Sequence, residues 1–338
     1  MARSRTKRFI HFLRFPLEAA VAYSLMAAFC LMPRRWTHWI GWAAGKAGFE
    51  FSGRSRRVAL ENLQLMLGVD EREARRIALA SCGQAGASFS DLIRAPRMTK
   101  RLARKFLEVP EETWQKIDAI RKGGRGAVMA CGHLGNWELL NLTSPFCGIP
   151  PMTVVVRPIL NPLLNTTLDY ARSRTGQRMI HRTGAAQECM QWVREGGTCG
   201  ITFDLPVPAE AGADAVDFFG RKTYTTLGVG YVAAMAHAPI YLAYCLHTGR
   251  GRYRLVLEGP IEVPDCATLK QSALEATRLV SRKLEEVIRA HPEAWGWWLK
   301  RWRIRPDGAA KEDYPSYSVE ASNYLGTGEK PRRDYAMK

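Results

Sequence analysis

His133 and Glu138 are the residues of this chain whose types and spacing best suit acid–base chemistry. They lie in the stretch ACGHLGNWELL, residues 130–140, between an apolar run and an amphipathic one. On a continuous helix two residues five apart point about 140° away from each other, because each residue turns the helix by about 100°. The two side chains can therefore meet only if His133 precedes the helix and folds back over its first turn. Gly132 and Gly135 give the backbone the freedom that such a turn needs.

A carboxylate that bonds one imidazole nitrogen fixes the tautomer of the ring and leaves the other nitrogen free as a general base. Glu138 would stay ionised near the positive end of the helix dipole. The pair would act as a Ser-His-Asp triad without its serine, so the attacking hydroxyl would belong to the substrate. The spacing alone is weak evidence in a chain with 7 histidines and 32 acidic residues. A buried structural histidine bonded to a nearby carboxylate is the competing interpretation.

The elements around this pair indicate an α/β fold. Beyond residue 120, short apolar runs typical of buried strands alternate with helical stretches. The predicted strands are residues 126–131, 152–157, 198–203, 238–246 and 253–259, and the predicted helices are residues 137–144, 161–174, 185–195, 225–236 and 268–290. His133 would then follow the carboxyl end of a strand, where open α/β sheets place their sites.

Composition points to an anionic partner. The formal charge of +17 favours nucleic acid, an acidic membrane surface, or phosphorylated substrates and acidic carrier proteins. The eight cysteines form no CxxC pattern and are interpreted as small core residues of a reducing compartment. No second His or Cys lies near His133 at ligand spacing, so we expect no metal and no cofactor.

The chain is predicted to have three parts. Residues 1–35 are basic and then apolar, and they form a membrane anchor that either spans the bilayer or lies in its surface; a buried soluble helix is the alternative. Residues 36–306 form the catalytic domain. Residues 307–338 are polar and are predicted to be a disordered tail. The segment WGWWLKRWR, residues 295–303, suits a membrane interface, although interleaved aromatic and basic residues also suit nucleic-acid stacking.

Several ordered blocks resemble one family. HLGNWELL is similar to the His-x4-Glu block of the bacterial lipid A late acyltransferases, the lauroyl and myristoyl transferase family, which also includes phosphatidylinositol mannoside acyltransferases. The resemblance covers about residues 8–306 and continues through VVVRPILNPLLNTTLDYARSRTG, REGGTCGITFDLP, VDFFGRKTYTTLGVGYVAAMAHAPI and HPEAWGWWLKRWRIRP. The sequence departs from the family in two motifs: Leu205 follows Asp204 where Gln is usual, and Lys300-Arg301-Trp302 stands where His-Arg-Arg is common.

The resemblance implies a glycerolipid acyltransferase-like fold, a mixed sheet flanked by helices, and acyl transfer with His133 and Glu138 as the catalytic dyad. The expected substrate-binding residues are Asn136, Arg157, Arg172 and Asp204. Backbone amides near Gly135 and Asn136 are candidate oxyanion donors.

The expected partners are an acyl-acyl carrier protein or acyl-CoA donor, a phosphorylated glycolipid acceptor and an anionic membrane, with no nucleic acid. The catalytic domain would face the cytoplasm at the inner membrane. A non-catalytic basic protein that binds membrane or nucleic acid is the alternative, and so is an acyltransferase for another lipid such as phosphatidylinositol mannoside.

Overall fold

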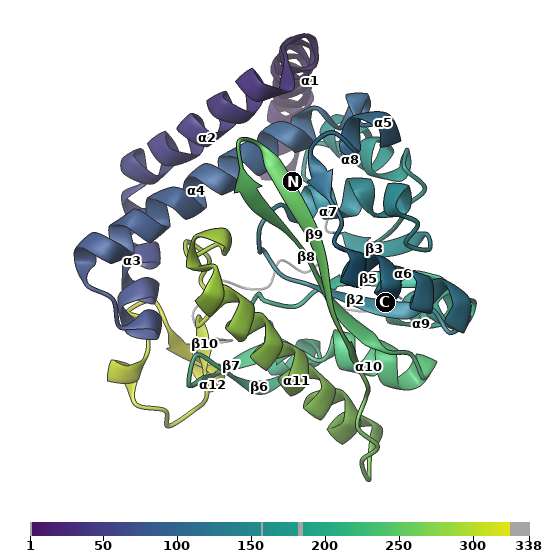
Figure 1. Ribbon diagram of the computed structural model, residues 1–338. Helices are drawn as coiled ribbons and strands as arrows, with labels where there is room; N and C mark the ends of the chain where they lie inside the picture. Colours follow the sequence, from purple (N-terminus) through teal and green to yellow (C-terminus); the bar gives the residue numbers. More distant parts are fainter. Residues whose placement is uncertain (1, 157, 182–184, 325–338) are drawn as a thin grey trace.

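A seven-stranded mixed sheet organises the chain (Figure 1). The structure is a computed structural model that describes residues 2–156, 158–181 and 185–324, and of residues 2–13 and 181 the backbone alone. The strand order is β1-β9-β8-β2-β5-β3-β4, in which β9 is antiparallel to β8 and the other neighbours are parallel. The α/β fold with a mixed sheet is thereby confirmed. The strands are β1 (Leu107–Glu108), β2 (Ala127–Cys131), β3 (Met152–Val156), β4 (Arg178–His181), β5 (Thr198–Thr202), β8 (Ile240–Gly249) and β9 (Arg252–Ile261).

Helices cover both faces of the sheet, because successive side chains of each strand point to opposite sides. In β2, Val128 and Ala130 enter one hydrophobic cluster, whereas Ala127 and Met129 enter the other. The first cluster includes α3 (Gly53–Leu67), α4 (Glu71–Ile93), α9 (Ala185–Arg194), α10 (Gly228–Ala236) and α11 (Leu269–Ala290). The second includes α5 (Lys100–Ala103), α6 (Glu111–Gly123), α7 (Trp137–Thr143) and α8 (Pro162–Ser173).

Capping residues in the sequence fix where several helices begin. The Asp70 carboxylate accepts a hydrogen bond from the Glu73 amide at 2.8 Å and starts α4. Thr268 caps α11 in the same way through the Gln271 amide. Side-chain acceptors at these positions satisfy amides that the first turn of a helix leaves without a partner.

The helix α2 (Arg34–Phe51) lies along α4 (Figure 1) with almost no space between the two backbones. A Cβ atom on Gly45 would lie 2.0 Å from the carbonyl oxygen of Cys82, and one on Gly86 would lie 2.0 Å from that of Gly41. Glycine at these positions therefore permits the close approach of the two helices.

The first helix, α1 (Ala2–Leu31), is long and apolar enough over Arg14–Leu31 to cross a membrane by length and composition, and most of this window is exposed. The side chains of Leu17, Val21 and Leu31 are 69%, 62% and 83% exposed. Length and composition alone are weak evidence of an anchor, because signal sequences share them. The exposure nevertheless argues against the alternative of a buried soluble helix.

The end of α1 is fixed to the body of the protein. The Arg94 guanidinium donates to the carbonyls of Phe29 and Met32, the latter at 2.6 Å, and Arg97 donates to the carbonyl of Cys30 at 2.6 Å. These bonds satisfy carbonyls that the last turn of a helix leaves free.

The polar C-terminal segment, for which we predicted disorder over residues 307–338, has regular secondary structure within residues 307–324. It contains β11 (Val319–Glu320), which pairs with β10 (Ile304–Arg305), and α12 (Ala321–Tyr324). The Tyr317 hydroxyl donates to Asn62 at 2.7 Å and ties the segment to α3. Residues 325–338 lie outside the described residues.

The tryptophan-rich segment is part of the core, and its predicted role as a membrane-facing surface was wrong. Trp295, Trp297 and Trp302 are fully buried, and Arg301 is buried beside them. The rings pack edge to face on Phe218 and Phe219, two aromatic residues at the turn between β6 (Ala213–Phe218) and β7 (Arg221–Thr226). Each indole N–H has an internal acceptor, so burial leaves none of these donors unsatisfied.

Candidate functional site

The structure places His133 two residues after the end of β2, ahead of α7. In the parallel pairing of β2 with β5, Cys131 lies opposite Thr202. His133 and Asp204 each follow their strand by two residues, so the two side chains emerge next to each other at the carboxyl edge of the sheet. This is the edge where open α/β sheets hold their ligands.

Glycines on either side of His133 let the turn pass close to neighbouring groups. A Cβ atom on Gly132 would lie 3.1 Å from Asp204 Oδ2. Gly135 has a φ of +61°, and a Cβ atom there would lie 2.1 Å from the Cys245 carbonyl oxygen. Both the left-handed conformation and the lack of space restrict position 135 to glycine.

Asp204 holds the imidazole of His133. The carboxylate is fully buried and accepts three hydrogen bonds: from His133 Nδ1 at 2.8 Å, from the His133 amide at 2.7 Å and from Trp295 Nε1 at 2.9 Å. The ring of Trp137 packs edge-on against the imidazole, with 5.1 Å between centroids. The His133 side chain keeps 21% of its surface exposed, and no hydrogen bond within the described part of the chain uses Nε2.

The charges around the pair stabilise an imidazolium–carboxylate state. Burial by itself would raise the pKa of Asp204, but the charge and hydrogen bonds of His133 outweigh it and lower that pKa. Burial would lower the pKa of His133, yet the charge and hydrogen bond of Asp204 and the charge of Glu138 together raise it. An imidazole with a raised pKa is a stronger base at the edge of the sheet.

Glu138 takes a different partner from the one predicted. Its carboxylate forms an ion pair with the Arg172 guanidinium, at 2.6 Å to Nη2 and 3.3 Å to Nε, and both side chains are mostly buried. In the described residues no hydrogen bond joins Glu138 to His133, so the expected contact between them is corrected. The imidazole bonds Asp204 because the strand register places that carboxylate beside it. Glu138 acts on His133 only through its charge.

The Glu138–Arg172 ion pair also occupies the arginine that we expected to grip a substrate phosphate. Arg172 lies in the last turn of α8, and Glu138 lies in the first turn of α7. The pair thus joins two helices next to the histidine. Arg157, the other predicted phosphate ligand, lies outside the described residues.

Asn136 has a structural position in place of the predicted substrate contact. It is fully buried, its Oδ1 caps α7 by accepting from the Leu139 amide at 2.9 Å, and its Nδ2 donates to Asp91 at 3.1 Å. The candidate oxyanion amides are also occupied. The Gly135 amide donates to the Ala294 carbonyl at 2.7 Å, and the Asn136 amide donates to the Cys245 carbonyl at 2.8 Å. Neither is free to bind an oxyanion.

Sequence reasoning missed residues that hold the site from outside the motif. Asp91 on α4 is buried and accepts two hydrogen bonds from Arg34 at 2.9 Å, besides the one from Asn136. Arg301 lies in the core with its guanidinium 5.0 Å from the Phe218 ring, and Asp204 acts electrostatically on it. No local pattern marks these residues, because their partners lie far away in the sequence.

These observations define a class of site: an imidazole held by a buried carboxylate at the carboxyl edge of an α/β sheet. Such a base removes a proton from a bound hydroxyl.

The chain belongs to the bacterial lipid A biosynthesis acyltransferase family, whose model matches residues 7–304. It is similar to a lipid A biosynthesis acyltransferase of Haemophilus influenzae, with 27% identity over 47% of this chain and 48% of that protein, so this alignment spans about half of the relative. It is similar to a phosphatidylinositol mannoside acyltransferase of Mycobacterium tuberculosis, with 24% identity over 79% of this chain and 88% of the relative. A lipid A biosynthesis lauroyltransferase of Escherichia coli is 21% identical over 82% of this chain and 95% of its own length.

Proposed function

We propose that the protein transfers a fatty acyl chain from the thioester of an acyl-acyl carrier protein or acyl-CoA to a hydroxyl of a phosphorylated glycolipid, such as a lipid A precursor. The hydrogen bond between His133 Nδ1 and Asp204 carries the proposal, because it presets the imidazole as a base. The family supports acyl transfer, and the names of the relatives support a glycolipid acceptor.

His133 is the general base in this mechanism. With Nδ1–H donated to Asp204, Nε2 holds the lone pair that takes the proton of the acceptor hydroxyl. The acceptor oxygen then attacks the thioester carbonyl and forms a tetrahedral oxyanion. When that intermediate collapses, the C–S bond breaks and the imidazolium returns the proton to the leaving thiolate. General-base assistance of this kind contributes roughly 10²–10⁴ in rate.

Asp204 orients the base, and Glu138 remains in the proposed catalytic site in a second role. Its charge adds to the rise in the pKa of His133, and its ion pair with Arg172 holds α7 against α8 beside the imidazole. A phosphate of the acceptor that reaches Arg172 would compete with Glu138 for the guanidinium.

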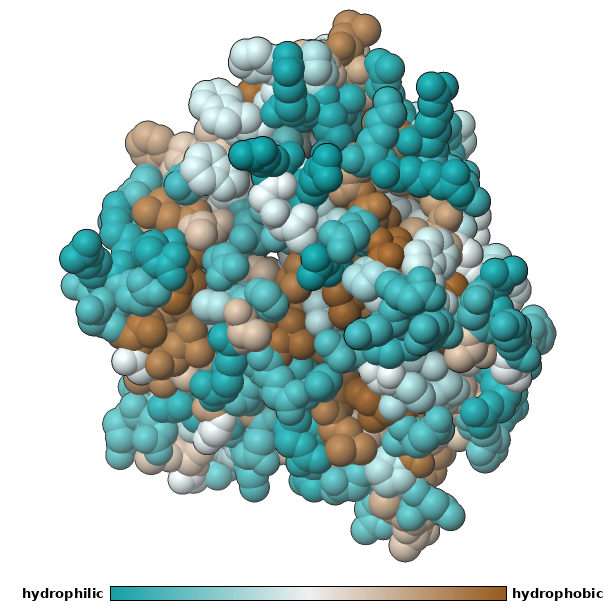
Figure 2. Space-filling view, viewed as in Figure 1, coloured by the Kyte–Doolittle hydropathy of each residue, from teal (hydrophilic) through white to brown (hydrophobic). Residues whose placement is uncertain are grey.

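The proposed location is the cytoplasmic face of the inner membrane. The apolar face of α1 is exposed over Arg14–Leu31, and Trp36 and Trp39 at the start of α2 are 54% and 62% exposed. Apolar side chains beside indole rings suit the boundary between acyl chains and headgroups. Figure 2 shows one face of the molecule as mostly hydrophilic, with hydrophobic side chains gathered in separate patches.

A second acceptor class has support of its own. The alignment with the mycobacterial phosphatidylinositol mannoside acyltransferase covers most of both chains, as does that with the Escherichia coli lauroyltransferase. Both acceptors carry phosphate and sugar hydroxyls, so the same base serves either one. The family match argues against the alternative of a non-catalytic basic protein.

Mass spectrometry of membrane lipids tests the proposal. We expect cells that express the wild-type chain to contain lipids with one additional acyl chain, and cells that express His133→Ala to lack them at equal protein levels. Near-normal transfer by the purified His133→Ala protein would refute the mechanism.

A further inference from the structure

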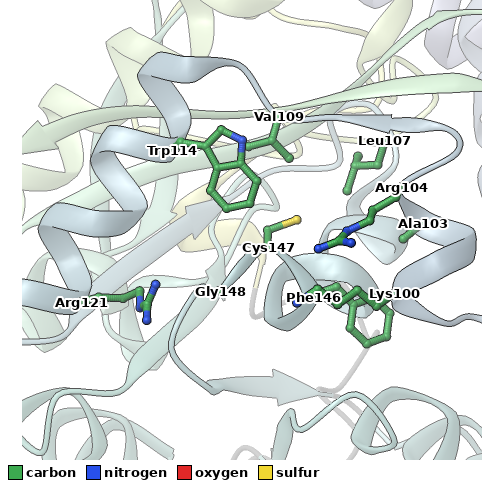
Figure 3. Close-up of a pocket in the computed structure, with 10 residues that line it drawn as sticks. All are labelled: Lys100, Ala103, Arg104, Leu107, Val109, Trp114, Arg121, Phe146, Cys147 and Gly148. Atoms are coloured by element: carbon green, nitrogen blue, oxygen red, sulfur yellow. The ribbon is translucent and has the colours of Figure 1, made fainter.

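A cavity lies away from His133, between α5, α6 and the short η2 helix (Ser144–Cys147) (Figure 3). Its volume is about 370 Å³, and neither His133, Asp204 nor Glu138 lines it. Its wall combines two kinds of side chain. Lys100, Arg104 and Arg121 bring positive charge, and Leu107, Val109, Trp114 and Phe146 bring apolar surface.

The positively charged side chains line the same cavity. Figure 3 shows Arg104 and Arg121 on opposite sides of the cavity, with Cys147 between them and the Trp114 ring above. Burial raises the pKa of the Cys147 thiol to about 11, while the charges of Lys100 and Arg104 act in the opposite direction. The charges of these two side chains therefore reach the floor of the cavity.

Negative charge is scarce around these cations. None of the described residues that line the cavity is acidic. Arg121 has Asp118 at 3.6 Å, in an exposed pair on the outside of α6. Such a pair contributes little to stability and gives way readily to an anion that bonds the guanidinium directly.

The position of the cavity connects it with α1. Lys100, at one edge, lies three residues after Arg97, which holds the carbonyl of Cys30 in the last turn of α1. Leu31, next to that carbonyl, is 83% exposed. If α1 enters a bilayer, this edge of the cavity lies near the depth of the headgroups.

We propose that this cavity binds the phosphate and glycerol of an anionic phospholipid from the membrane on which the enzyme works. The guanidinium groups bind the phosphate, and the Trp114 and Phe146 side chains cover the glycerol and the first methylenes. The proposal rests on the proposed membrane association. This phospholipid site would be separate from the acceptor site at His133.

Native mass spectrometry of the full-length protein in a non-ionic detergent tests this site. We expect one molecule of phosphatidylglycerol to bind in preference to phosphatidylcholine, whose choline offsets the phosphate charge. Arg104→Gln/Arg121→Gln should weaken this binding roughly 30-fold, the value for two cations at an anionic lipid surface. The matched control is Arg72→Gln/Arg282→Gln, which removes two exposed arginines of α4 and α11 that do not line the cavity. It should bind phosphatidylglycerol as the wild type does.

Two results would overturn the proposal. Equal loss in both double variants would reduce the binding to net charge. Displacement of the phospholipid by phosphopantetheine at equal concentration would assign the cavity to the arm of the acyl donor. Acyl transfer in detergent is measured on the same preparations, so failure of this site is distinguishable from failure of the proposed enzyme function.

Discussion

Asp204→Asn should disable the base while it leaves the fold largely in place. In the wild type, Asp204 Oδ2 accepts from the His133 amide and from Trp295 Nε1, and Oδ1 accepts from His133 Nδ1. An asparagine that keeps its oxygen on the two buried donors must present its NH₂ group to Nδ1. The imidazole would then accept at Nδ1 and carry its proton on Nε2, which is the wrong tautomer for a base.

The expected loss in kcat/KM is about 10²–10⁴-fold, the range for removal of general-base assistance. The expected loss of unfolding free energy is only about 1–3 kcal/mol, because most buried donors keep an acceptor. The assay is transfer of a radiolabelled acyl chain from acyl-acyl carrier protein to a lipid A precursor, together with denaturant unfolding. Trp295→Phe is the control, since it removes one donor to Asp204 but leaves the bond to the imidazole.

The pH profile gives an independent readout of the same variant. The base acts as neutral His133, whose pKa is raised, so the wild-type rate should rise with pH through a value above the ordinary 6.5. Asp204→Asn removes the charge that raises this pKa, and burial then lowers it, so the rising limb should move to lower pH. Wild-type kcat/KM with an unmoved rising limb in Asp204→Asn would refute the assignment of Asp204 as the orienting group.

Three further predictions concern the ion pair, the helix pair and the membrane. Glu138→Gln and Arg172→Met should each cost about 1–3 kcal/mol in unfolding free energy, because each leaves a mostly buried charge unpaired. In a double-mutant cycle the double variant should recover part of this loss. Additive losses would contradict the pairing. Gly45→Ala should lower the unfolding free energy, since its Cβ would lie 2.0 Å from a carbonyl oxygen. Gly48→Ala has open space around its Cβ and should raise the unfolding free energy by about 0.5–1 kcal/mol. Equal effects of the two variants would contradict the close packing of α2 on α4. Membrane association should survive a high-salt wash and yield to detergent, since apolar burial of α1 is not screened by salt; release by salt alone would contradict the anchor.

Much of the fold could be predicted from the sequence because buried strands read as apolar runs. The predicted strands at residues 126–131, 152–157 and 198–203 match β2, β3 and β5 to within one residue at each end. The β6–β7 hairpin and β4 were missed, because sequences such as RKTYTT and RMIH alternate polar with apolar residues or carry charge. The Trp295–Trp302 segment was wrongly predicted to lie at the surface, because a mixture of aromatic and basic residues is also typical of membrane interfaces. The acceptors of its buried indole N–H groups lie elsewhere in the chain and have no local sequence signal.

The candidate site could be predicted only as far as local spacing reaches. His133 and its turn glycines are neighbours in the sequence, and the structure places them as expected after a strand. Asp204 is 71 residues away, and it meets the imidazole only because β2 pairs with β5 in one register. The five-residue spacing predicted Glu138 as the carboxylate that bonds His133. In the structure the register between β2 and β5 places Asp204 in that position.

Long-range pairing also fixes how the N-terminal helices meet the turn that carries His133. Arg34, three residues after the end of α1, bonds both oxygens of Asp91, which is 1% exposed. Asp91 in turn accepts from Asn136, the N-cap of α7. Removal of Arg34 would leave a buried carboxylate without its cation, a loss of about 3–5 kcal/mol for pairs of this kind. These hydrogen bonds therefore tie the start of α2 to the turn before Glu138. If α1 enters the membrane, the same contacts set the orientation of His133 toward the bilayer.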